Sequence, residues 1–99
     1  MIDFYLIQDD HSKRNSPRQA GLQLAGGLED ESFERLKDKG IIDKHFDTYG
    51  TFRWQTTVIS RIKKTIIQRE LGSDNDVKDL LNLLLIAEEN QSGLIAYGD

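Results

Sequence analysis

Two acidic residues and a histidine, Asp9, Asp10 and His11, follow directly after a run of strand-forming residues near the N-terminus. Side chains at a strand end can converge on a metal ion or a scissile bond, and His45, with Asp47 nearby, would extend the set of ligands. Neither histidine stands at a spacing that recurs in metal sites, such as two histidines one helical turn apart. A polar turn accounts for the same residues. We therefore predict no metal and no catalytic residue, and keep a small metal-assisted hydrolase using Asp9, Asp10 and His11 as an alternative.

Three other patterns resemble sites for acid–base catalysis, calcium binding or phosphate binding. Glu88, beside Glu89, falls close to an apolar helix stripe, where burial would raise the pKa of the carboxyl group and suit it to general acid catalysis. A position in a frayed last turn, reaching water, is the preferred interpretation. Residues 74–76 resemble the start of a calcium loop but lack its glycine and terminal glutamate, and Gly26-Gly27 lacks the residues of a phosphate loop. We predict no cofactor.

Aromatic residues gather in residues 45–54, which hold four of the eight in the chain. Gly50 argues against a long helix there, so we expect irregular structure. Aromatic and arginine side chains supply most interface hot spots, because they bury a large area with little loss of entropy. The alternative is that Phe52 and Trp54 fill the core. The predicted partner-binding residues are Tyr49, Phe52, Arg53 and Trp54.

The charge of the chain is acidic and unevenly distributed. The formal net charge is −4, and residues 70–99 carry seven acidic residues against Lys78 alone. This charge argues against general binding to nucleic acid or to an anionic membrane, although Arg53, Arg61 and their basic neighbours offer a weaker nucleic-acid alternative. An acidic third could meet a basic partner, but an ordinary solvated helix face is the preferred interpretation.

The composition of the chain argues against disulfide-rich, thiolate-dependent and membrane-spanning proteins. The chain has 99 residues and no cysteine, so we expect one domain, residues 1–99, without disulfides or thiolate chemistry. The longest apolar run, residues 83–87, is far shorter than the roughly 20 residues that cross a bilayer. The first residues lack the pattern of a secretory signal, and a cytoplasmic location is expected.

The first half of the chain predicts strands and one short helix. Residues 2–8 alternate as a strand that places Phe4 on one face and Tyr5 on the other, and residues 9–19 read as a loop. A short strand over residues 22–25 should end at Gly26-Gly27. A helix over residues 31–39 should be capped by Asp30 and stopped by Gly40.

The second half predicts two long helices and a last strand. Thr56 or Thr57 should open the first helix, and Gly72 should end it. The second should run over residues 76–90, after a segment rich in capping residues. Its Leu83, Leu85 and Ile86 add apolar surface beyond one inner stripe, which indicates either burial between layers or a homodimer interface. A final strand should cover residues 94–97.

Together these elements predict an α/β domain of the α+β kind. A small sheet containing both terminal strands should be packed by a hairpin of the two long helices and by the short helix. Strand order and direction do not follow from the sequence.

Two stretches carry a resemblance to a known class. Phe52-Arg53-Trp54 ahead of an isoleucine-rich helix, and residues 93–99 after a leucine-rich helix, resemble small uncharacterised bacterial proteins of the immunity type. The resemblance covers the C-terminal half and transfers no site residue. It implies an inhibitor that binds a cognate toxin domain, and the acidic charge would suit a basic nuclease. We therefore predict a non-enzymatic protein-binding module, with a homodimeric interaction protein or the small hydrolase as alternatives.

Overall fold

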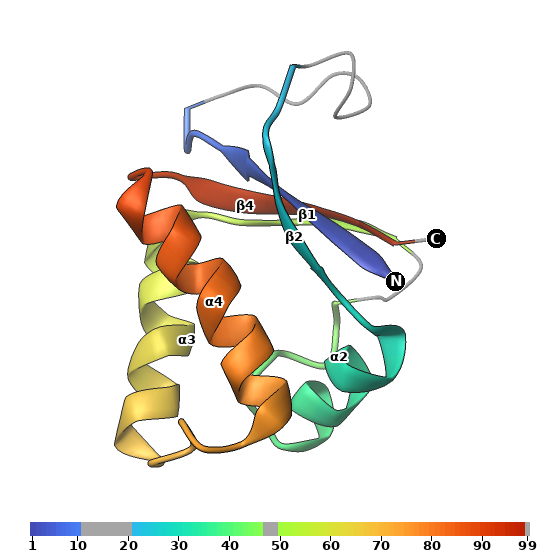
Figure 1. Cartoon of the computed structure of the whole chain (residues 1–99), viewed down its shortest axis with the longest axis vertical. Coiled ribbons are helices and arrows are strands. Elements are labelled where there is room, and N and C mark those ends of the chain that lie inside the picture. The colour runs from blue at the N-terminus through green and yellow to red at the C-terminus, as the bar shows by residue number, and fades with distance from the viewer. Residues whose placement is uncertain (11–20, 47–49, 99) are drawn as a thin grey trace.

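The computed structural model describes residues 1–10, 21–46 and 50–98. They form an α+β fold built on a four-stranded antiparallel sheet in the order β2-β1-β4-β3, with the two terminal strands side by side at its centre (Figure 1). The predicted fold class is therefore confirmed. The strands are β1 (Ile2–Ile7), β2 (Leu24–Leu28), β3 (Thr51–Trp54) and β4 (Gly93–Gly98).

Three helices lie on the same side of this sheet (Figure 1). They are α2 (Asp30–Asp38), α3 (Thr56–Gln68) and α4 (Asn75–Glu89), and α3 and α4 form the predicted hairpin. The core between sheet and helices is apolar and fully enclosed, as shown by Phe4, Phe33 and Leu84, each 0% exposed. Among the residues that the structure describes, no helix has the length and apolar character needed to span a bilayer.

The ends of α2 differ in part from the prediction. Asp30 is the first residue of the helix and not its cap; Glu29 takes the cap position, with no side-chain hydrogen bond to the helix. The Asp30 carboxylate instead lies 3.1 Å from the N-terminal amine of Met1. Gly40 does stop the helix, in a left-handed conformation with φ of 75° that lets the Ile41 amide donate to the Leu36 carbonyl.

The connection between α3 and α4 corrects a second prediction. Gly72 does not end α3, because Glu70 already takes the left-handed conformation, with φ of 54°. The chain then turns so that the Leu71 amide donates to the Ile66 carbonyl. Of the capping residues offered by the segment before α4, Asp74 is the one that caps the helix: its carboxylate accepts from the Asp76 and Val77 amides at 2.9 and 3.3 Å.

β2 runs through Gly26-Gly27, where the sequence predicts its end. The absence of a side chain at Gly26 admits α4, since a Cβ atom there would lie 2.9 Å from Leu83 Cδ2. Leu83 is consequently 3% exposed. Of the surplus apolar residues on α4, Leu83 is buried within the chain, Ile86 packs partly against the core and Leu85 remains 39% exposed. One chain thus covers most of the surface that suggested a homodimer.

Candidate functional site

Strand β3 separates the predicted binding residues onto two faces. Successive side chains of a strand point to opposite faces, and the pairing of Phe52 with Ala96 places Phe52 on the helix-covered face, with Trp54. Arg53, which pairs with Ile95, belongs to the opposite face. Tyr49 lies outside the described residues. The expected irregular structure is therefore wrong for residues 51–54, and the residues predicted to bind together do not share one surface.

Phe52 and Trp54 belong to an aromatic cluster inside the core. Trp54 is 0% exposed, and its ring centroid lies 5.4 Å from those of Phe4 and Phe52. Phe52, which is half-buried, also stacks on Phe33 at 5.5 Å and contacts Phe46 at 5.0 Å. Of the two interpretations of Phe52 and Trp54, filling of the core is therefore the one that matches their position.

Arg53 ties the end of β1 to β3. Its guanidinium Nη2 donates to the backbone carbonyls of Gln8 and Asp9, the latter at 2.9 Å. These bonds hold the chain where it leaves the central strand. Arg53 therefore has a positioning task within the fold, and replacing it would affect structure as well as any partner.

Asp9 acts as an external cap for α3. Its carboxylate accepts from the Thr56 hydroxyl at 2.5 Å and from the Thr56 amide at 3.0 Å. These two hydrogen bonds, aided by the charge of Arg53, lower the pKa of Asp9 below its ordinary value although partial burial opposes the shift. Asp9 is thereby committed to the helix end.

The described residues do not assemble the suggested metal site. His11 and Asp47 lie outside them, and His45 packs its ring against Phe46 at 4.1 Å. Within residues 1–10, 21–46 and 50–98, no three histidine or acidic side chains stand close enough together to hold a metal ion.

Three acidic residues of the C-terminal third, Asp74, Asp76 and Glu88, pair with basic residues of the preceding helical region. Asp74 pairs with Lys39 at 2.5 Å, and Glu88 pairs with Lys63 at 2.8 Å. Asp76, 8% exposed, accepts two hydrogen bonds from the Arg35 guanidinium, at 2.7 and 2.9 Å. Glu88 is thus an exposed, paired carboxylate in the last turn of α4. These three residues of the acidic segment fasten α4 to α2 and α3, whereas Glu70, Asp79 and Glu89 are exposed.

The sheet face opposite the three described helices carries a different set of side chains. Tyr5 and Tyr97, on the adjacent strands β1 and β4, meet edge to face with ring centroids 5.9 Å apart. Ile7 and Ile95 belong to the same face and are buried, at 1% and 0% exposed. The hydroxyl oxygen of Tyr97 is buried as well, whereas Tyr5 and Tyr97 as whole residues are partly exposed. Burial, with the proximity of Tyr5, raises the pKa of Tyr97, so its phenol stays protonated at neutral pH.

Exposed apolar side chains extend this face over β2. Leu24 pairs with Tyr5 and is 56% exposed, the second most exposed large apolar side chain in the described part of the chain. Met1 is 51% exposed and lies over Gly27, where a Cβ atom would be 3.0 Å from its sulfur. We call the surface formed by Met1, Asp3, Tyr5, Leu24 and Tyr97 the tyrosine face.

One end of the tyrosine face is acidic. Asp3 pairs with Tyr97, and the pairing of Ile2 with Leu28 brings Glu29 and the start of α2 to the same end of the sheet. Glu29 and Glu31 are exposed and make no ion pair within the described residues. The acidic surface of the molecule therefore includes a region in the N-terminal half, which the uneven charge of the sequence did not indicate.

The alternation of residues 2–8 already placed Tyr5 away from Phe4. The sequence does not predict that β1 pairs with β4. This pairing brings Tyr97, near the C-terminal end of the chain, next to Tyr5. No protein-family model, curated protein or solved structure matches this chain.

Proposed function

We propose that this chain is a non-enzymatic protein-binding module that uses its tyrosine face to bind a basic protein. The observation that carries the proposal is the pair of contacting tyrosines, both partly exposed, on the sheet face that none of the described helices covers. Tyrosine combines a large apolar area with a hydrogen-bonding hydroxyl and is enriched among interface hot spots. Leu24 and Met1 add apolar area around the pair.

The charge of the partner follows from the acidic end of this face. Asp3, Glu29 and Glu31 would face a partner at the edge of the contact, where charges mainly affect association rate and specificity. A basic protein surface is complementary to them. Inhibition of a basic toxin domain, the role implied by the resemblance to immunity proteins, is the specific form of this proposal.

The alternatives have weaker support. The hydrolase would need Asp9 as a free ligand or base, whereas both of its oxygens accept hydrogen bonds from Thr56. A homodimer through α4 would rest on Leu85, because Leu83 is occupied by packing against β2. Self-association therefore stays a prediction, to be measured by light scattering.

Capture with matched baits tests the proposal. The intact protein, a Tyr5→Ala/Tyr97→Ala variant and an Ile67→Ser control, which changes the 64% exposed Ile67 of α3, would be used to isolate partners. Any captured protein would then be purified and titrated by calorimetry. We expect a basic partner, binding weakened about 30-fold or more by the tyrosine substitutions and unchanged by the control.

Salt and activity provide two further readouts. The affinity should fall as ionic strength rises, because the acidic end contributes by long-range attraction. If the partner is a toxin domain, the intact protein should inhibit it and the tyrosine variant should not. A partner that binds both baits equally well would contradict the proposed surface.

A further inference from the structure

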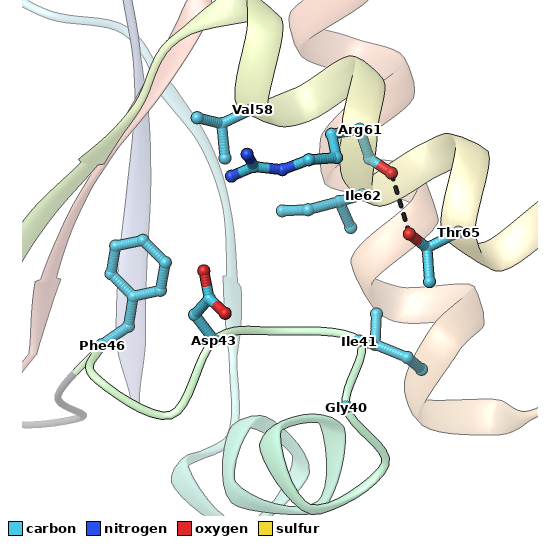
Figure 2. A pocket seen from close by; sticks show the side chains of 8 residues that line it. All are labelled: Gly40, Ile41, Asp43, Phe46, Val58, Arg61, Ile62 and Thr65. Atoms are coloured by element: carbon cyan, nitrogen blue, oxygen red, sulfur yellow. Dashed lines mark hydrogen bonds between the residues drawn. The ribbon is translucent and has the colours of Figure 1, made fainter.

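A cavity of about 170 Å³ lies between α3 and the loop of residues 40–46, on the helix side of the molecule and away from the tyrosine face (Figure 2). Its apolar walls are Ile41, Phe46, Val58 and Ile62. An apolar cavity of roughly 150 Å³ is sufficient to hold one benzene ring, and sites for drug-sized ligands begin at roughly 300 Å³. The cavity therefore suits one branched or aromatic side chain and is too small for a nucleotide.

The loop that closes this cavity is held at both ends. Lys37 Nζ donates to the Phe46 carbonyl at 2.8 Å, and Arg69 Nη1 donates to the Lys39 carbonyl at 2.7 Å. The Ile41 amide donates to the Leu36 carbonyl at 3.1 Å. The cavity is consequently present before any ligand arrives, which lowers the cost of binding.

Opposite charges face each other across the apolar walls. Arg61 comes from α3 and Asp43 from the loop, and Figure 2 shows the guanidinium and the carboxylate both directed toward the space between them. Both side chains are exposed, and neither makes an ion pair within the described residues. A guanidinium recognises a carboxylate by paired hydrogen bonds, and a carboxylate recognises an ammonium group.

From this juxtaposition we infer that the cavity binds a free α-amino acid with a branched or aromatic side chain. The side chain of the ligand enters the apolar space beside Ile62 and Phe46. Its carboxylate pairs with Arg61, and its ammonium group pairs with Asp43. The inference is independent of the protein-binding role proposed above, because the two surfaces share no residue.

L-phenylalanine is the first probe, in a titration of the intact protein followed by NMR spectra of the backbone amides. We expect shifts confined to the 40–46 loop and α3, with a dissociation constant of about 1 mM, typical of a small ligand with few contacts. L-phenylalaninamide, which has no carboxylate, and N-acetyl-L-phenylalanine, which has no ammonium group, should each bind about tenfold more weakly.

Two variants assign the charges. The backbone carbonyls of Arg61 and Asp43 accept hydrogen bonds from the Thr65 hydroxyl and the Phe46 amide. Arg61→Gln and Asp43→Asn change only the side chains and leave these bonds intact, so both variants should fold. Arg61→Gln should bind L-phenylalanine and L-phenylalaninamide with equal affinity. Asp43→Asn should bind L-phenylalanine and N-acetyl-L-phenylalanine with equal affinity. Lys64→Gln, on the same helix but outside the cavity lining, is the charge-matched control.

Other outcomes would overturn the inference. Equal affinity for the amide would indicate the N-terminal residue of a peptide as the ligand, and equal affinity for the acetylated form would indicate a C-terminal residue. The absence of shifts in the loop and α3 up to about 20 mM, well above the expected dissociation constant, would show that the cavity binds no amino acid.

Discussion

Both faces of the sheet carry aromatic residues, yet these residues are buried to different degrees. On the covered face, Phe4 and Trp54 are 0% exposed and pack under the helices. On the other face, Tyr5 and Tyr97 contact each other, with the exposed Leu24 next to them. The difference shows that aromatic enrichment by itself does not mark a binding site. The helix layer decides whether an aromatic residue of the sheet is fully enclosed, as Trp54 is, or stays partly exposed, as Tyr5 does.

The largest expected effect is on the covered face. Trp54→Ala removes the largest fully buried side chain and leaves a cavity next to Phe4, so it should lower the free energy of unfolding by about 3–5 kcal/mol. Denaturation by urea, followed by circular dichroism, measures this loss. A loss below about 1 kcal/mol would mean that the helix layer does not depend on Trp54 and would remove the contrast between the faces.

A glycine substitution tests how closely β4 approaches the end of β3 within the sheet. A Cβ atom at Gly93 would collide with the Trp54 carbonyl and lie 3.3 Å from an Asp9 carboxylate oxygen. We expect Gly93→Ala to cost about 3 kcal/mol. Gly72→Ala is the matched control, because nothing lies within 4 Å of its added methyl group. Similar melting temperatures for the two variants would contradict the close approach.

The charges on the helix side are predicted to stabilise the fold in a pH-dependent way. The two hydrogen bonds from Arg35 lower the pKa of Asp76 from 3.8 to about 2, against the effect of burial. Because the pKa is lower in the folded state, this contribution is present above pH 4 and is lost as the pH falls toward 2.

Substitution of Asp76 checks that contribution. Asp76→Asn should lower the free energy of unfolding by about 2 kcal/mol at pH 7, as expected for a charged hydrogen-bonded pair. Its difference from the parent should shrink between pH 4 and pH 2. Asp79→Asn, on the exposed side of the same helix, should have little effect at either pH. An equal response of the two variants would show that the pairing with Arg35 is not stabilising.

The smallest effects on stability are expected on the tyrosine face. Tyr5→Ala should cost about 1 kcal/mol, the value of an edge-to-face aromatic pair, and Leu24→Ser about 0.5 kcal/mol or less. Thermal unfolding measures both. A loss of several kcal/mol for Tyr5→Ala would make this face a second core, and the proposed binding surface would then be wrong.

Much of the fold was predictable because local patterns are strong. The period of apolar residues predicts α3 and α4, and the segment of residues 73–76 is recognisable as the start of α4 from its several capping residues. The predicted ends of elements differ from the structure where a contact with another element has more influence than the local sequence pattern. Gly26-Gly27 is typical of a strand end, but β2 continues through it: Gly26 admits Leu83 of α4, and Gly27 lies against Met1.

The candidate site was less predictable for a related reason. The sequence alone determined which residues alternate along β1, and therefore that Phe4 and Tyr5 point to opposite faces. The strand β3, which places Phe52 and Arg53 on opposite faces, did not follow from the sequence. Only the tertiary structure decided which face is covered, which acids are paired with α2 and α3, and which strands are adjacent. Tyr5 and Tyr97 meet because β1 pairs with β4, a contact between the two ends of the chain that no local preference encodes.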